Sequence, residues 1–255
     1  MYAEERQQAM ARLVTERRRL SVAALAEEYA VTTETVRRDL SVLERAGLVR
    51  RVHGGAVPAS ALASVESELD ERAGTHTAAK ERIARAAVAQ LPPDGSTVII
   101  DAGSTTARLA TVIPTDLRLS VHTHAVPVAA RLVSLPRVDL HLLPGRVRRT
   151  TQAAVGADTV AALGLLRADV VFLGTNGLEA EHGLSTPDSD EAGTKRAIVA
   201  AARRVVVLTD SSKIGAAAPV RFARLDEVDC LVTDDGIEDG VRRHLEELGI
   251  EVVVA

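Results

Sequence analysis

Apolar residues follow two different rhythms along this chain. In the first part they recur at steps of three and four residues, as in Val36, Leu40 and Leu43, which places them on one face of a helix. From residue 97 onward they form short unbroken runs separated by helical segments. The pattern therefore predicts a small helical part at the N-terminus, followed by a larger part in which strands and helices alternate.

The N-terminal part is predicted to hold three helices and a hairpin. The helices cover residues 3–17, 22–29 and 33–46. Ser21 is expected to cap the second helix, and Thr32 or Thr33 the third, because their side chains can accept a hydrogen bond from a free backbone N–H. Gly47 stands where the third helix should end. A strand over 48–52, a turn at 53–55 and a return strand from 56 complete a winged helix-turn-helix.

The third helix has a polar and largely cationic outer face. In a helix-turn-helix the second of the paired helices enters the major groove, and the wing contacts the DNA backbone or the minor groove. We therefore expect a double-stranded operator DNA as partner. The alternative is a small three-helix bundle with no DNA role, which the wing and the paired arginines disfavour. The predicted DNA contacts are Thr33, Glu34, Thr35, Arg37, Arg38, Ser41, Arg50, Arg51 and His53.

Residues 58–77 are predicted to join two domains. This segment begins Pro58-Ala59-Ser60-Ala61 and has no sustained apolar period. A helix over 78–91 follows and stops at Pro92-Pro93-Asp94-Gly95, a strong helix breaker. The predicted organisation is a DNA-binding domain of residues 1–57, a linker of residues 58–77 and an effector-binding domain of residues 78–255.

Strands and helices alternate through the second domain. Strands are predicted at 97–100, 117–122, 138–143, 169–173, 205–208, 230–232 and 251–254. Helices are predicted at 105–112, 125–132, 157–165, 190–202 and 239–248. Because the strands are apolar throughout, both faces of their sheet should be covered, which is typical of a mostly parallel sheet. Such α/β domains bind ligands in the loops beyond the carboxyl ends of the strands.

Four of those loops have the composition of a ligand site. The first, residues 101–106, combines small residues with hydroxyls at a helix start, which suits a phosphate, although an ordinary capped turn fits it equally well. It lacks the Gly-Lys-Ser/Thr element of nucleotide-hydrolysing loops. The other three loops are residues 173–177, 188–195 and 210–213, and two of them contain a lysine, Lys195 or Lys213. The predicted effector contacts are Asp101, Gly103, Ser104, Thr105, Thr106, Asn176, Gly177, Glu191, Lys195, Asp210 and Lys213.

For several polar residues of this domain, a purely structural role is also open. Glu191 and Lys195 are four apart on a helix and could form a surface ion pair of about 0.3–0.5 kcal/mol. His122 and His124 are two apart, but the loops offer no further metal ligands, so a hydrogen-bonding or structural role is favoured and no bound metal or cofactor is expected. Cys230 lies within an apolar strand and should be buried.

Composition narrows the class of protein further. The 255 residues are 46% hydrophobic but only 2% aromatic, with no Trp, so a sugar would be held by hydrogen bonds and charge rather than by stacking. The net charge is −4, divided as +2 over residues 1–60 and −6 over the rest. A single Cys argues against a disulfide framework and a cysteine zinc site. No apolar run is long enough for a membrane helix, and residues 1–20 are too charged for a signal peptide, which favours a soluble cytoplasmic protein.

The sequence resembles the DeoR-type bacterial transcription regulators. In the N-terminal part the resemblance rests on Leu20-Ser21-Val22, Leu25-Ala26, Thr35-Val36-Arg37-Arg38-Asp39-Leu40, Leu43 and Val52-His53-Gly54-Gly55-Ala56. In the second part it rests on the Asp101–Thr106 loop, Glu191 with Lys195, Asp210 to Lys213, Lys80, Leu143-Pro144-Gly145 and Gly156. Two positions depart from the family pattern: His124 stands where Asn is usual, and Arg146 where a second Gly is common.

The resemblance implies an effector domain similar to the ribose-phosphate isomerase fold. It also implies a homo-oligomeric repressor of carbohydrate-metabolism genes that a phosphorylated sugar releases from its operator. One alternative is a sugar-phosphate isomerase with an appended DNA-binding domain, in which Glu191 or Asp210 is the base and Lys213 the phosphate anchor. Another is an interaction scaffold, which leaves the four polar loops unexplained.

Overall fold

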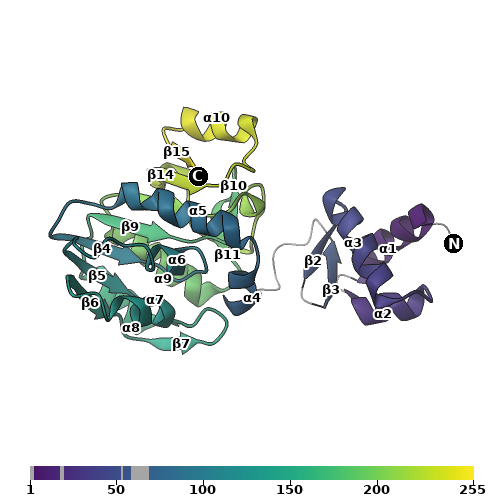
Figure 1. The fold of residues 1–255 in the computed structure, drawn as a ribbon, viewed down its shortest axis with the longest axis horizontal. Coiled ribbons are helices and arrows are strands. Elements are labelled where there is room, and N and C mark those ends of the chain that lie inside the picture. Colours follow the sequence, from purple (N-terminus) through teal and green to yellow (C-terminus); the bar gives the residue numbers. More distant parts are fainter. Residues whose placement is uncertain (1–2, 18–19, 53, 59–68) are drawn as a thin grey trace. The chain divides into compact units, whose positions relative to one another are not determined.

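The structure, a computed structural model, describes residues 3–17, 20–52, 54–58 and 69–255 (Figure 1). The chain divides into two units, Met1–Ser67 and Glu68–Ala255, and each is described by itself.

The N-terminal unit is a winged helix-turn-helix, as predicted. Its elements in chain order are α1 (Ala3–Arg17), β1 (Leu20–Ser21), α2 (Val22–Glu28), α3 (Thr33–Arg45), β2 (Val49–Val52) and β3 (Gly55–Pro58). Ser21 caps α2 by accepting from the N–H of Ala24, and Thr32 caps α3 by accepting from the N–H of Thr35. The three strands form a sheet in the order β1-β3-β2.

Two features of this unit follow directly from its sequence. At Gly55, where β3 pairs with β1, an added Cβ would lie 2.1 Å from the carbonyl oxygen of Leu20, so the close strand approach requires glycine. The buried face of α3 includes Asp39, whose carboxylate accepts from Arg6 Nε at 2.7 Å and Gln7 Nε2 at 2.8 Å. An acidic residue on the core face of α3 therefore ties α1 to α3.

The second unit contains the rest of the elements. Its helices are α4 (Leu69–Gly74), α5 (Thr77–Ala87), α6 (Thr106–Leu109), α7 (Val126–Leu132), α8 (Ala157–Gly164), α9 (Ser189–Ala201) and α10 (Asp239–Glu247), with 3-10 turns at Val88–Gln90, Ser211–Lys213 and Leu225–Glu227. The strands of the main sheet are β4 (Ser96–Ile100), β5 (Leu119–Thr123), β6 (Val138–Leu142), β9 (Val170–Leu173), β12 (Val205–Leu208), β14 (Cys230–Thr233) and β15 (Glu251–Val254). The apolar runs in the sequence predicted all seven of these strands.

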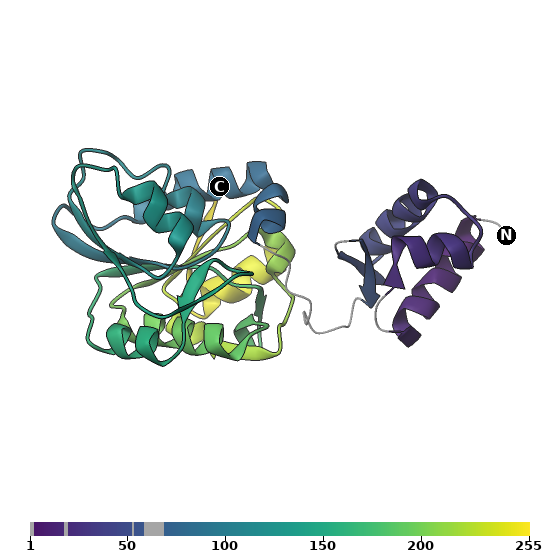
Figure 2. The same cartoon turned by 90° about the horizontal axis from the view of Figure 1, so that it is seen from below.

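The seven strands form one parallel sheet in the order β15-β14-β12-β9-β4-β5-β6. Helices α5, α6 and α7 pack on one face and α8, α9 and α10 on the other (Figure 2). The chain runs outward from β4 to β6 and then returns to β9, from which it continues in the opposite direction. The connections therefore switch direction between the neighbouring strands β4 and β9, where α/β sheets bind ligands beyond the carboxyl ends.

The structure differs from the sequence-based expectation in its shorter elements. Helix α4 falls within residues 58–77, which were expected to be a linker, and helix α6 is a single turn rather than the longer helix expected over 105–112. The two-residue strand β1 was not predicted, nor were five short strands of the second unit. Those five form a hairpin of β7 (Arg146–Arg148) with β8 (Ala153–Val155), and an antiparallel sheet of β10 (Gly177–Glu179), β11 (Gly183–Thr186) and β13 (Val220–Ala223).

Within the described residues, no helix combines the length and the apolar character needed to cross a membrane.

Candidate DNA-binding surface and effector pocket

Helix α3 presents a polar outer face opposite a buried stripe of Val36, Leu40 and Leu43. Arg37 and Arg38 are both exposed on that face. Arg37 lies 3.4 Å from the carboxylate of Glu34, one turn earlier, and this exposed pair is easily exchanged for contacts to DNA. The face therefore offers guanidinium groups to phosphates or base edges.

The wing and α3 form one continuous surface. Arg51 of β2 donates from Nη1 to the hydroxyl of Ser41 at 2.9 Å, and its backbone N–H donates to Glu44 at 2.9 Å. Of the predicted DNA contacts, Thr33, Glu34 and Arg51 are exposed, while Thr35 and Ser41 are half-buried. Nothing is described of the Arg50 side chain, and His53 lies outside the described residues.

A pocket lies at the switch point between β4 and β9. It is bounded by the loops that follow β4, β9 and β12, by the start of α9, and by α4 and α5. Its lining comprises Arg72, Lys80, Ala102, Gly103, Ser104, Thr105, Thr106, Gly174, Thr175, Asn176, Glu191, Lys195, Leu208, Thr209, Asp210 and Lys213. Strands β4, β9 and β12 are neighbours in the sheet, and this brings together loops that lie far apart in the sequence.

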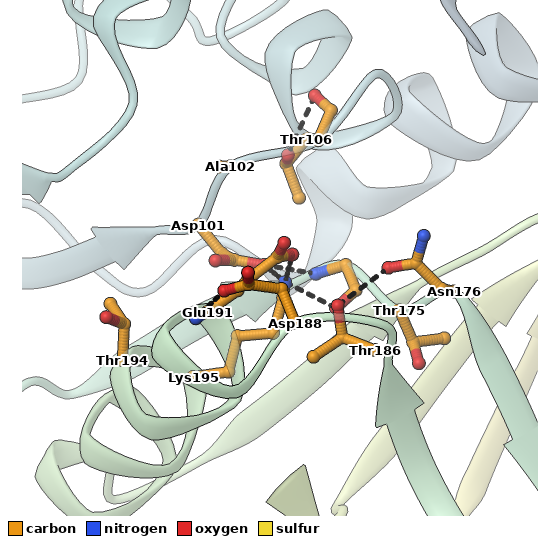
Figure 3. Close-up of polar contacts among 12 residues, drawn as sticks. Asp101, Ala102, Thr106, Thr175, Asn176, Thr186, Asp188, Glu191, Thr194 and Lys195 are labelled. Atoms are coloured by element: carbon orange, nitrogen blue, oxygen red, sulfur yellow. Dashed lines mark hydrogen bonds and ion pairs between the residues drawn. The ribbon is translucent and has the colours of Figure 1, made fainter. Parts of the chain in front are cut away.

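Asp101 and Lys195 form a buried ion pair at the base of this site (Figure 3). The Lys195 ammonium also donates to the carbonyl of Gly174 at 2.9 Å, and Asp101 accepts from the N–H of Gly174 at 2.9 Å. Burial raises the pKa of the Asp101 carboxyl, but Lys195 and His124 outweigh that effect and bring the pKa down to about 2. Asp101 is thus ionised and fixes the loop after β4 to the loop after β9.

Glu191 is held by two cations. Arg148 of β7 donates to its Oε2 at 2.8 Å, and Lys195 lies 3.7 Å from its Oε1. Arg148 also pairs with Asp188 at 3.4 Å, and Asp188 caps α9 by accepting from the N–H of Glu191 at 2.9 Å. The pairing of Glu191 with Lys195 is therefore real, but both side chains are buried rather than on the surface.

His124 is a fully buried hydrogen-bonding residue. One ring nitrogen, Nδ1, lies 2.7 Å from the carbonyl of Ala154, and the other, Nε2, lies 2.9 Å from Asp101 and 3.2 Å from the N–H of Ala102. His122 is placed differently, because its ring stacks on that of His141 at 4.4 Å. Among the described residues, no group of three or more His, Cys, Asp or Glu could hold a metal ion.

Cations gather around the pocket. Lys80, Lys195 and Lys213 line it together with Arg72. Lys80 is only 3% exposed and lies 4.0 Å from Asp210, and burial lowers the pKa of its ammonium to about 8 despite that carboxylate. Because α6 is a single turn, its dipole adds little positive potential, and these side chains supply the charge for an anion.

Most of the predicted effector contacts meet in this one pocket. Asp101 lies beneath the lining as a positioning group, and Gly177 is not part of the lining. At Gly177 an added Cβ would lie 2.4 Å from the carbonyl oxygen of Ala216, so glycine serves strand packing there. The predicted effector contacts did not include Arg72, Lys80 or Arg148, although Lys80 is part of the family resemblance. Lys80 carried a usable signal, since it lies three residues before Ile83 on the apolar stripe of its helix.

Both units match known domain families. A DeoR-like helix-turn-helix domain matches residues 6–61, and a DeoR C terminal sensor domain matches residues 75–235. The chain belongs to the DeoR family. It is therefore a DNA-binding transcription regulator, and the helix-turn-helix and α/β fold expected from the sequence are confirmed.

Relatives match over nearly the whole chain. The HTH-type transcriptional regulator GlpR of Haloferax volcanii is 35% identical over 99% of this chain and 98% of its own length. The glycerol-3-phosphate regulon repressor of Escherichia coli K12 is 33% identical, over 92% of each chain. Among solved structures, ribose 5-phosphate isomerase A from Methanocaldococcus jannaschii is 18% identical over 55% of each chain, with a TM-score of 0.41, a likeness too distant to bear on function.

Proposed function

We propose that this DeoR-family regulator represses carbohydrate-metabolism genes and that a phosphorylated sugar, bound in the pocket at the switch point, releases it from operator DNA. The observation that carries the proposal is the pocket itself, where four cationic side chains surround hydroxyls and backbone groups at the carboxyl edge of the sheet. Charge and hydrogen bonds of this kind suit a phosphate attached to a polyhydroxylated carbon chain.

The two ends of the ligand have different partners in this proposal. Arg72, Lys80 and Lys213 supply charge for the phosphate, and Ser104 and Thr105 supply hydroxyl donors. Thr186 donates to the Oδ1 atom of Asn176 at 3.1 Å, which leaves the NH₂ group of that side chain as a donor for a sugar oxygen. Glu191 offers a carboxylate as acceptor.

Turnover of the ligand is not part of this proposal. A general base for isomerisation must be free to take a proton from carbon. Glu191 is held between Arg148 and Lys195, and Asp210 accepts a hydrogen bond from the hydroxyl of Ser212 and lies 4.0 Å from the ammonium of Lys80. Both carboxylates therefore favour a stable binding site over an isomerase.

We also propose that the regulator acts as a homo-oligomer on repeated half-sites. The N-terminal 60 residues carry a net charge of only +2, so one copy has little electrostatic affinity for DNA. Two copies would place two α3 helices one helical turn apart on the duplex, about 34–36 Å.

A thermal-shift screen tests the sensing half of the proposal. Phosphorylated trioses, pentoses and hexoses are compared with the same sugars without phosphate, because a ligand that binds the folded state raises its melting temperature. We expect at least one phosphorylated sugar to stabilise the protein, its parent sugar to have no effect, and Lys213→Met to abolish the shift. Stabilisation by parent sugars alone, or by no compound, would contradict the proposal, and sustained turnover of any sugar phosphate would favour the isomerase.

A further inference from the structure

Helix α4 forms part of the pocket wall. It is the first described element after residue 58, and it is only six residues long. Its first residue, Leu69, donates its backbone N–H to the carbonyl of Thr150 at 2.9 Å. Its fourth residue, Arg72, lines the pocket. Ligand binding in the pocket can therefore act on α4 directly.

Lys80 links the pocket to the C-terminal end of α4. Its ammonium donates to the carbonyl of Arg72 and, at 2.9 Å, to that of Thr75. Lys80 also lines the pocket, although it is only 3% exposed. The carbonyls at the end of a helix have no partner within the helix, so these bonds hold the end of α4 in place.

Arg108 provides a second hold on α4 that is independent of the pocket. Its Nη2 donates to the carbonyl of Ala73 at 2.7 Å, and its Nη1 lies 3.6 Å from Glu81 of α5. Arg108 is not part of the pocket lining. The chain thus offers one cation, Lys80, that touches both α4 and the pocket, and another, Arg108, that touches α4 but does not line the pocket.

The enclosed part of the pocket is small. Its cavity volume is about 30 Å³, whereas one water needs roughly 10–15 Å³ on this measure. A sugar phosphate that is fully enclosed by the site would therefore displace part of the wall. The strand ends and α9 are tied together by the buried pairs of Asp101 and Glu191, whereas α4 is a single short helix of six residues.

We propose that the effector's phosphate captures the ammonium of Lys80 from the carbonyls at the end of α4, so that ligand binding releases the C-terminal end of this helix. This inference rests on the proposed function, since it names how the same pocket responds to its effector. A phosphate dianion is a stronger acceptor for an ammonium than two neutral carbonyls. The depressed pKa of Lys80 agrees with this exchange, because its charge is poorly compensated until an anion arrives.

Hydrogen exchange of the full chain tests the proposal, with inorganic phosphate as the probe. Exchange of residues 69–77 is measured by mass spectrometry in phosphate and in chloride of equal ionic strength. We expect phosphate to speed exchange there by about fivefold or more, the lower end of ordinary allosteric coupling. The amides of β9 in the same unit serve as the internal control and should not change.

Two variants separate the roles of the two cations. Lys80→Met should exchange fast at 69–77 without phosphate and should lose the melting-temperature shift caused by phosphate. Arg108→Met should also exchange fast but keep that shift, because Arg108 does not touch the pocket. Should Lys80→Met fail to fold, Lys80→Arg keeps the charge, and the wild-type comparison alone still decides the proposal.

The outcomes distinguish this inference from the proposed function. If phosphate raises the melting temperature while exchange at 69–77 is unchanged or slower, α4 does not respond as proposed and the sensing function still stands. If neither phosphate nor any phosphorylated sugar raises the melting temperature, the proposed function fails and this inference fails with it.

Discussion

Each buried charge described at the sensor site lies beside a partner of opposite sign, and these pairs fix the positions of the side chains. Asp101, Glu191 and Lys195 are all nearly inaccessible to water, which is tolerable only because each is hydrogen-bonded and paired. Removing one partner would leave an uncompensated charge in the interior. An exposed pair of the same chemistry would cost little to break.

Two arginines of β7, one in a buried ion pair and one in an exposed pair, allow the costs of breaking the two kinds of pair to be compared. Arg148→Met should destabilise the sensor unit by about 3 kcal/mol, because Glu191 would lose its closest cation while buried. Arg146, two residues earlier, pairs with Asp190 at 2.7 Å, but its side chain is 66% exposed against 13% for Arg148. Arg146→Met should therefore cost less than about 1 kcal/mol. Urea unfolding compares the two, and equal losses would contradict this account of the buried network.

Lys80 should make phosphate binding depend on pH. A lysine with its ordinary pKa keeps its charge well above pH 8, but burial lowers the pKa of Lys80 to about 8. The groups facing it are Asp210, which raises the pKa, and Lys213, Arg108 and Arg72, which lower it. Since the protonated form binds the anion, phosphate affinity should fall as the pH rises through about 8.

Calorimetric titration with a phosphate monoester between pH 7 and pH 9.5 checks this dependence, because a second pKa of about 6 keeps the monoester mostly a dianion over this range. Lys80→Arg should flatten the profile, because a guanidinium keeps its proton throughout. A profile that is equally steep in Lys80→Arg would assign the pH dependence to another group.

At the scale of elements, the sequence predicted the helices and strands that have a clear apolar pattern of their own. It did not predict the elements that form through contacts with distant residues. The seven parallel strands were predictable because each is an apolar run buried on both faces. The short strands β7, β8, β10, β11 and β13 were not, since three or four residues carry too little pattern and their pairing depends on tertiary contacts. Helix α4, with the sequence LDERAG, has no apolar period and forms against its neighbours.

The candidate site was likewise predictable in part, from the composition of its loops but not from the contacts between them. The loops at strand ends could be identified from their composition, and most of their residues line the pocket. The pairing of Asp101 with Lys195 spans 94 residues and depends on the strand order, which the sequence does not reveal. Arg148 and Arg72 enter from β7 and α4, the elements whose existence was not predicted. His124, where the family pattern has Asn, became understandable only through its contacts with Ala154 and Asp101.

Helix α3 carries a prediction at the same scale. Arg38 is exposed on the outer face of α3, so Arg38→Ala should weaken DNA binding by about 1–3 kcal/mol while sugar-phosphate binding persists. Arg12→Ala removes an exposed arginine from α1 and serves as the charge-matched control. Fluorescence anisotropy on a duplex selected by the protein from a random library gives the affinities. Equal effects of the two substitutions would mean that only net charge matters, and loss of ligand binding in Arg38→Ala would contradict the independence of the two units.

At the scale of the whole molecule, regulation requires that the effector bind two states of the protein with different affinity. The pocket lies wholly in the sensor unit, and α3 lies in the other. Helix α4 lines the pocket through Arg72 and is the first described element after residue 58. In the proposed function no catalytic step is needed, because a ligand with different affinity for the two states shifts the DNA-binding equilibrium by itself.

The most direct test of this account is the DNA affinity of the full chain with and without a stabilising phosphorylated sugar. The ligand is the one identified by thermal shift, and the duplex is the one selected from the random library. We expect the ligand to weaken DNA binding by about 5–150-fold, its parent sugar to have no effect, and Lys213→Met to bind DNA normally without responding. A ligand that stabilises the protein yet leaves the DNA affinity unchanged would contradict the claim that this pocket controls DNA binding.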